Sequence, residues 1–294
     1  MIHASRSLHF VPGANEKMLA KALASEADAL ILDLEDAVTP DNKASARATI
    51  ASWLADPRVR RKPILVRINA TDTDWWRADL EATHAAAPDA YLVPKVCSAA
   101  EVTDLDQTLA KLEQAAPIPL FLIGGETPAG VLSLPQLPCV DRVQGLTWGA
   151  EDLAAALGAR RNRDNHGQWL PPFEQARTMT LLAAGAAGIA PIDTVYTDFG
   201  DDAGLRVDSD LAADMGFTGK LTIHPAQIPI VNEVFTPDDA EINEARELVQ
   251  AFEENERAGR MAFQFRGQMV DVPHLRRAQR VLARAEALED RPGN

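Results

Sequence analysis

The chain has 294 residues, of which 46% are hydrophobic and 24% charged, the composition of a folded globular protein with a large core. Its 29 basic and 43 acidic residues give a net charge of −14, which repels polyanions and argues against a nucleic-acid partner. No uncharged stretch is long enough to cross a membrane, and no apolar signal core opens the chain. Cys97 and Cys139 lack metal-binding or redox spacing. We therefore expect a cytoplasmic protein.

Eight short apolar segments alternate with helical segments along the chain and recur roughly every 30 residues, as in a repeated strand–helix unit. The segments are Leu8–Val11, Ala29–Leu34, Ile64–Ile68, Tyr91–Val96, Leu120–Ile123, Val143–Trp148, Asp193–Thr197 and Leu221–Ile223. This pattern predicts an α/β protein whose residues 1–235 form a closed (β/α)8 TIM barrel. An open doubly wound sheet is the alternative, although Pro12-Gly13 follows the first segment in place of a G-x-G-x-x-G turn.

The later part of the chain carries more than a barrel needs. Gly158–Pro172, rich in Arg, Asn and Gly, reads as a loop inserted after the sixth strand. Beyond the eighth strand, Pro237–Gly259 and Leu275–Leu288 have the pattern of charged helices on either side of a loop, Phe263–His274. We therefore expect residues 236–294 to form a C-terminal helical extension or lid.

Polar side chains follow nearly every predicted strand, at the end of the barrel where TIM-barrel active sites lie. They are Asp33, Glu35, Asp36, Arg67, Asn69, Lys95, Glu126, Glu151, Asp152, Asp198 and His224. So many carboxylates repel one another unless cations or a metal neutralise them, and an all-oxygen set favours Mg²⁺. Glu126 and Asp152 are the predicted metal ligands because each follows an apolar strand beside glycine. Arg67 is a predicted clamp for a substrate carboxylate.

Each of these side chains also has a structural interpretation. Asp36 and Asp152 could cap the helices that follow them. Arg67 could form an ion pair with the acids of the second strand. Lys95 fits an ion pair better than a Schiff-base lysine, because neighbouring acids keep its amine protonated.

Ordered sequence blocks occur along almost the whole chain. They are Arg6–Gly13, Leu32–Val38 followed by Lys43 and Arg47, Val66–Asn69, Val93–Lys95, Glu126–Val131, Trp148–Leu153, Gly219-Lys220 with Ile223–Gln227, and Gly267–Asp271. Together they resemble the citrate lyase beta-subunit-like branch of the HpcH/HpaI aldolase superfamily. The resemblance implies a trimeric or hexameric Mg²⁺-dependent lyase. Such an enzyme cleaves or condenses malyl-, citramalyl- or citryl-CoA, or an acyl-carrier equivalent, to a keto acid and an acyl thioester.

The resemblance also implies roles for single residues. It places the metal on Glu126 and Asp152, the substrate carboxylate on Arg67, the keto acid on the backbone near Ala150 and Glu151, and the thioester or phosphates on Arg6 and Lys17. Asp271 matches an aspartate that in malyl-CoA lyase relatives enters a neighbouring subunit's site, where it would exchange a proton with the thioester enolate. Its alternative role is to cap the following helix. Asp36 is a further catalytic candidate.

Other functions stay open at this point. The chain could act only within a citrate lyase complex with an acyl-carrier partner, or bind metabolites without turnover. It could be a malyl-CoA thioesterase, in which water attacks the thioester. It could also be an aldolase for 4-hydroxy-2-oxo acids, although the segment Gly267–Asp271 is superfluous to a bare barrel.

Overall fold

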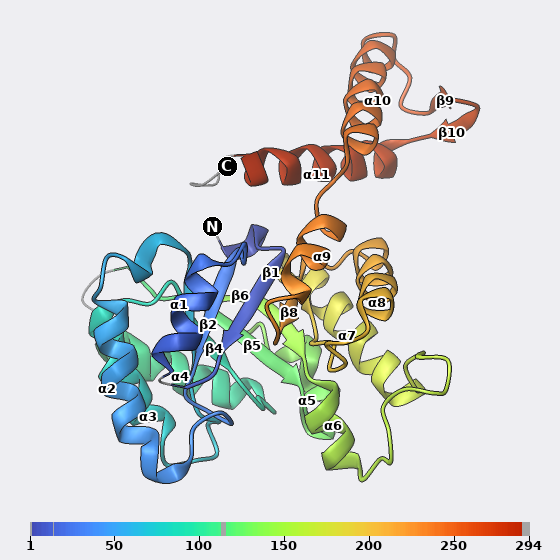
Figure 1. Cartoon of the computed structure of the whole chain (residues 1–294). Coiled ribbons are helices and arrows are strands. Elements are labelled where there is room, and N and C mark those ends of the chain that lie inside the picture. The colour runs from blue at the N-terminus through green and yellow to red at the C-terminus, as the bar shows by residue number, and fades with distance from the viewer. Residues whose placement is uncertain (1, 14, 113–115, 290–294) are drawn as a thin grey trace. The chain divides into compact units, whose positions relative to one another are not determined.

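The computed structural model describes residues 2–13, 15–112 and 116–289, and the chain divides into two compact units, Met1–Glu233 and Val234–Asn294 (Figure 1). The strands of the first unit are β1 (Ser7–Val11), β2 (Ala29–Asp33), β3 (Ile64–Arg67), β4 (Ala90–Val93), β5 (Leu120–Gly125), β6 (Val143–Trp148), β7 (Ala190–Asp193) and β8 (Gly219–Thr222). They pair in parallel in sequence order, and β8 closes on β1. The predicted (β/α)8 barrel is therefore confirmed, and the open sheet is excluded.

Helices surround this barrel and connect its strands. They are α1 (Glu16–Ala24), α2 (Lys43–Leu54), α3 (Trp76–Thr83), α4 (Ala99–Leu112), α5 (Pro128–Ser133), α6 (Ala150–Leu157), α7 (Pro171–Ala187), α8 (Asp202–Met215) and α9 (Gln227–Val234). Short 3₁₀ helices cover Ile2–Ala4, Pro40–Asn42, Val59–Arg61, His84–Ala86 and Leu134–Gln136. Within the described ranges, no helix is long and apolar enough to span a membrane.

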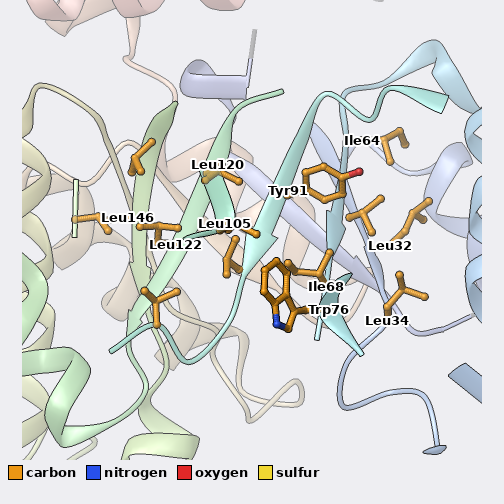
Figure 2. Close-up of a cluster of buried hydrophobic side chains, with 14 of the residues drawn as sticks. Leu32, Leu34, Ile64, Ile68, Trp76, Tyr91, Leu105, Leu120, Leu122 and Leu146 are labelled. Atoms are coloured by element: carbon orange, nitrogen blue, oxygen red, sulfur yellow. The ribbon is translucent and has the colours of Figure 1, made fainter. Parts of the chain in front are cut away.

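The strands are apolar on both faces because each face packs against a different core. Alternate residues such as Ile31 and Leu65 belong to a cluster inside the barrel, whereas Leu32 and Val66 belong to a larger cluster under the helices. Figure 2 shows part of the outer cluster, where Trp76 of α3 joins strand residues including Leu32. Each such leucine or isoleucine contributes about 1.5–3 kcal/mol on burial, which explains the unbroken apolar run of β2.

The seventh strand begins three residues before its predicted start. β7 covers Ala190–Asp193, and residues 194–197 continue beyond it at the barrel mouth. Pro191 has no N–H to give, but its carbonyl accepts a hydrogen bond of 2.9 Å from Thr218 N. Asp193 can end a buried strand because Arg177 and Lys220 neutralise its carboxylate, at 2.8 Å and 2.7 Å. The predicted bounds of the seventh strand are wrong because Arg177 and Lys220, which allow Asp193 to lie in a buried strand, are far from it in the sequence.

The second unit contains α10 (Asp239–Arg257), β9 (Phe263–Phe265), β10 (Gln268–Val270) and α11 (Val272–Glu289). The prediction of a plain loop over 263–274 is wrong, because β9 and β10 pair as an antiparallel hairpin. Its two turn residues, Arg266 and Gly267, both have positive φ (48° and 85°), the conformation that suits a two-residue hairpin turn. Apolar residues of α10, β10 and α11, such as Phe252 and Val270, form a separate small core.

Candidate active site

The carboxyl ends of the strands gather six of the predicted site residues around one cavity. Asp36, Arg67, Glu126, Ala150, Glu151 and Asp152 all line this cavity, whose volume is about 470 Å³. Much of the rest of its wall is apolar and comes from residues such as Phe10, Ile123 and Leu221. The cavity therefore combines charged and apolar lining residues, which suits a substrate that has both a carboxylate and an apolar part.

Arg67 ends β3 and engages the acids of the second strand. Its Nε and Nη2 donate to the two carboxylate oxygens of Asp33, both at 2.7 Å, and its Nη1 lies 2.9 Å from Glu35 Oε2. The guanidinium also sits over the Phe10 ring, 4.8 Å from its centroid. The ion-pair interpretation of Arg67 is thus realised. Because a guanidinium has five N–H donors, these contacts still leave donors for a substrate oxygen.

Lys95 follows β4 and forms the ion pairs expected of it, with the carboxylates of Glu35, Asp36 and Asp152. Its φ of 54° is left-handed, which is unfavourable for a residue with a side chain. In this conformation its backbone N–H donates to Glu126 Oε2 at 2.7 Å. Its Nζ donates to Glu35 Oε1 at 2.5 Å and lies 3.4 Å from Asp152 Oδ1. Burial lowers the pKa of Lys95, but the bond to Glu35 and the surrounding acids outweigh it, so the pKa rises and the amine stays protonated.

Glu126 lies directly beyond β5 and is 4% exposed. Gly149 makes room for it, because a Cβ there would lie 2.6 Å from Glu126 Cγ and 2.9 Å from its Oε1. Burial, with smaller contributions from the charges of Glu35 and Asp152, raises the pKa of Glu126 to about 8. The Glu126 carboxylate therefore needs either a proton or a further cation at neutral pH.

A magnesium ion fits this donor set. Glu126 Oε1 has no hydrogen-bond donor among the described residues, and the Asp152 carboxylate is partly exposed in the same cavity. Across the described part of the chain, no three His, Cys, Asp or Glu side chains are close enough to enclose a metal by themselves. Mg²⁺ does not require this, since it commonly binds one or two carboxylates and completes its shell with water and substrate oxygens.

The other residues at the mouth have more modest contacts. Ala150 and Glu151 begin α6, whose first N–H groups have no partner within the helix. The Glu151 carboxylate accepts a bond of 2.7 Å from Asn162 Nδ2. The Asp36 side chain is 60% exposed and lies 3.5 Å from Lys95 Nζ. Lys17 is an exposed residue in the first turn of α1.

Two predicted residues of the first unit, Arg6 and Lys17, do not line this cavity. Arg6 precedes β1 and so lies at the amino end of the barrel, where Asp28 accepts bonds of 2.7–2.8 Å from its backbone N–H, Nε and Nη2. The expected thioester contact of Arg6 did not take into account that a residue before a strand lies at the end of the barrel opposite the carboxyl ends of the strands. Asp271 belongs to the second unit, where its carboxylate lies 2.6 Å from His274 Nδ1 and half of the side chain is exposed.

A buried polar network behind the mouth went unpredicted. Trp148 Nε1 donates to Asp193 Oδ1 at 2.9 Å, and Arg177 and Lys220 contact the same carboxylate. All four side chains are almost fully buried, and Lys220 also reaches Asp208 at 2.8 Å. The sequence gives only a partial signal for it: Lys220 interrupts an apolar strand, whereas Arg177 follows other polar residues of its helix, Glu174 and Gln175. The network holds Trp148, the residue directly before Gly149, in place.

Comparison with known proteins shows several similarities. The family model for HpcH/HpaI aldolase/citrate lyase matches residues 6–225. A (3S)-malyl-CoA thioesterase of Cereibacter sphaeroides is 40% identical over 97% of this chain and 96% of its own length. An L-malyl-CoA/beta-methylmalyl-CoA lyase of the same organism is 33% identical over 95% of this chain and 94% of its own.

A solved structure of CitE from Mycobacterium tuberculosis, in complex with magnesium, acetoacetate and coenzyme A, has a TM-score of 0.80 and 35% identity. This similarity covers 97% of the present chain and 99% of that one. A citrate lyase beta subunit from the same organism, complexed with oxaloacetate and magnesium, has a TM-score of 0.70 and 35% identity, covering 80% and 99% of the two chains.

Proposed function

We propose that this chain, which belongs to the HpcH/HpaI aldolase/citrate lyase family, is a Mg²⁺-dependent enzyme acting on CoA thioesters of the malyl type. The observation that carries the proposal is the buried Glu126 carboxylate, held by Lys95 N–H beside Gly149 and sharing its cavity with Asp152 and Arg67. The magnesium, keto acid and coenzyme A in a similar structure, and the malyl-CoA activities of similar proteins, support it.

Glu126 and Asp152 would hold the metal, which when bound supplies Lewis-acid stabilisation of charge on substrate oxygens. The N–H groups at the start of α6, at Ala150 and Glu151, would donate to the substrate carboxylate. The remaining donors of Arg67 would bind that carboxylate from the other side. Lys95 stays protonated, so its role is to offset the repulsion among the mouth carboxylates rather than to act as a base.

We place hydrolysis of the thioester first among the reactions. The similar proteins that are 38–40% identical are malyl-CoA thioesterases, whereas the similar lyases are 33% identical. In hydrolysis, water adds to the thioester carbonyl carbon, the C–S bond breaks, and CoA leaves as the thiol. Asp271 and Asp36 are the candidate carboxylates for moving the water proton.

Carbon–carbon cleavage is the second candidate, and the lyase relatives and the family favour it. In that reaction a base takes the hydroxyl proton of malyl-CoA and the bond between the hydroxyl-bearing carbon and the neighbouring methylene breaks. Glyoxylate leaves, and the resulting enolate takes a proton, from Asp271 in this proposal, to give acetyl-CoA.

A product analysis tests the proposal and separates the two reactions. The purified chain is incubated with malyl-CoA and Mg²⁺, and free thiol, malate, glyoxylate and acetyl-CoA are measured. Hydrolysis gives malate with one thiol, whereas cleavage gives glyoxylate and acetyl-CoA without thiol. Citramalyl- and citryl-CoA complete the panel. Absence of all products, or full activity in Glu126→Gln, contradicts the proposal. Turnover by the chain alone argues against a need for a larger citrate lyase complex.

We further propose that the chain forms a homotrimer or hexamer in the cytoplasm and that residues 236–294 act as a lid, with Asp271 of one copy entering the site of another. Sedimentation measures the assembly. Coexpression of inactive Glu126→Gln and inactive Asp271→Asn chains tests the sharing, because mixed assemblies would contain sites with both intact residues. Mixed assemblies with no recovered activity contradict it.

A further inference from the structure

Asp271 and His274 form a close pair at the start of α11. Asp271 Oδ1 lies 2.6 Å from His274 Nδ1, and both side chains are about half exposed. The backbone N–H of Asp271 also points at this ring nitrogen, at 3.2 Å. Among the described residues, no other ionisable side chain lies within ion-pair distance of either group. The imidazole ring therefore folds back over Asp271 and contacts it twice.

The Asp271 carboxylate does not cap α11, although a cap is the alternative role for this residue. A capping side chain accepts a hydrogen bond from the second or third N–H of the helix. The second residue is Pro273, which has no N–H, and the N–H of the third, His274, donates to the backbone oxygen of Asp271 at 3.0 Å. The His274 ring takes the place that glutamate or glutamine has in a capping box, since it accepts from the Asp271 N–H. Within the described ranges, the carboxylate is left for the imidazole alone.

The two contacts at His274 Nδ1 imply a proton that the pair shares. One ring nitrogen either donates or accepts a hydrogen bond. When Nδ1 carries a proton, it donates to the Asp271 carboxylate. When Nδ1 has its lone pair free, it accepts from the Asp271 N–H and from a protonated Asp271 carboxyl group. The two forms differ in the position of one proton across 2.6 Å, a short separation of the kind found in charge-assisted hydrogen bonds.

We infer that His274 positions the Asp271 carboxyl group and relays protons to and from it, an inference that rests on the proposed role of Asp271 in turnover. In carbon–carbon cleavage, Asp271 gives its carboxyl proton to the enolate carbon, and the Nδ1 proton of His274 replaces it at Oδ1. In hydrolysis, Asp271 takes a proton from the attacking water and passes it to the free lone pair of Nδ1. The half-exposed ring then exchanges this proton with the solvent, as imidazole does readily near neutral pH.

The test compares wild type with His274→Gln and His274→Ala on malyl-CoA in the presence of Mg²⁺. Glutamine keeps an acceptor for the Asp271 N–H, as in a capping box, but it cannot carry a proton. We expect kcat to fall about tenfold to 100-fold in both variants, with KM nearly unchanged, because the loss concerns proton transfer and not substrate binding. Imidazole added to the buffer should restore much of the kcat of His274→Ala, a recovery that a purely structural role of His274 would not produce.

His84→Gln is the matched control, because the ring of His84 contacts the backbone oxygens of Leu80 and Glu81, and this variant should keep the kcat of wild type. The urea midpoint of His274→Gln should equal that of wild type. A wild-type kcat in His274→Gln would overturn the inference, and so would a loss in His274→Ala that imidazole does not relieve. In both cases turnover by wild type would still support the proposed function. If wild type processes no thioester, the proposed function fails, and this inference fails with it.

Discussion

Replacing Gly149 by alanine tests whether its missing side chain shapes the metal site. An added Cβ would lie 2.6 Å from Glu126 Cγ, so the glutamate must retreat by about 0.8 Å to reach an ordinary contact of 3.4 Å. That displacement breaks the 2.7 Å bond from Lys95 N to Glu126 Oε2. The Gly149 backbone, with φ −132° and ψ 110°, is acceptable to alanine, so the effect is steric rather than conformational.

The size of the effect follows from the bond that is lost. A hydrogen bond to a charged group contributes about 1.5–3 kcal/mol, and each 1.4 kcal/mol is about tenfold in affinity. We therefore expect Gly149→Ala to weaken Mg²⁺ binding about tenfold to 100-fold and to lower kcat similarly, with little change in the free energy of unfolding. Isothermal titration with Mg²⁺ and urea denaturation measure the two quantities separately.

Gly185→Ala is the matched control. Gly185 lies in α7 with nothing within 4 Å of its added Cβ, so alanine should raise the free energy of unfolding by about 0.5–1 kcal/mol and leave Mg²⁺ affinity unchanged. Wild-type Mg²⁺ affinity in Gly149→Ala would refute the steric reasoning. So would a large loss of stability in that variant, because the defect would then be in the fold.

Three further predictions concern residues around the site. Lys95→Met and Lys95→Gly both remove the ammonium, but only glycine adopts the left-handed φ without strain. The free energy of unfolding in urea should therefore be about 1 kcal/mol higher for Lys95→Gly than for Lys95→Met. Equal stability of the two variants would count against strain at this position. Asp193→Asn leaves the two buried cations Arg177 and Lys220 with a single carboxylate, that of Asp208, and should cost about 3–5 kcal/mol in urea denaturation. A loss below about 1 kcal/mol would be incompatible with this view. Burial lowers the pKa of His9 from 6.5 to about 4, so between these pH values the unfolded state binds more protons, and the free energy of unfolding falls as the pH drops from 6.5 to 4. His9→Gln should reduce this fall by up to about 3 kcal/mol. A pH profile of stability equal to that of wild type would contradict this reasoning.

The barrel and the place of its mouth were predictable because they depend on local patterns. Strand-length apolar runs at regular spacing indicate parallel strands covered on both faces, and the position after each strand fixes which side chains meet. This is why Glu126 and Asp152 were expected together and do line one cavity. The same logic, applied to the residue before β1, would have excluded Arg6 from the mouth.

What could not be predicted depends on side-chain geometry or on distant partners. The sequence allowed both a free and a paired Arg67, and the contact with Asp33 depends on rotamers across two strands. The left-handed backbone of Lys95 has no sequence signal, since lysine seldom adopts it. The β9–β10 hairpin did have a signal, the glycine at position 267, but the turn was too short to be recognised among charged helices.

The carboxylate of Asp193 has a consequence for how the protein opens. It accepts from Trp148 of β6, Arg177 of α7 and Lys220 of β8, so it joins two strands to an outer helix. If α7 detaches, Trp148 loses its partner, and Gly149, which follows it, loses its support. Amide hydrogen exchange in α7 and β6 would then report one shared opening event. Substitutions on the outer helix layer would thus tune metal affinity without touching the metal site.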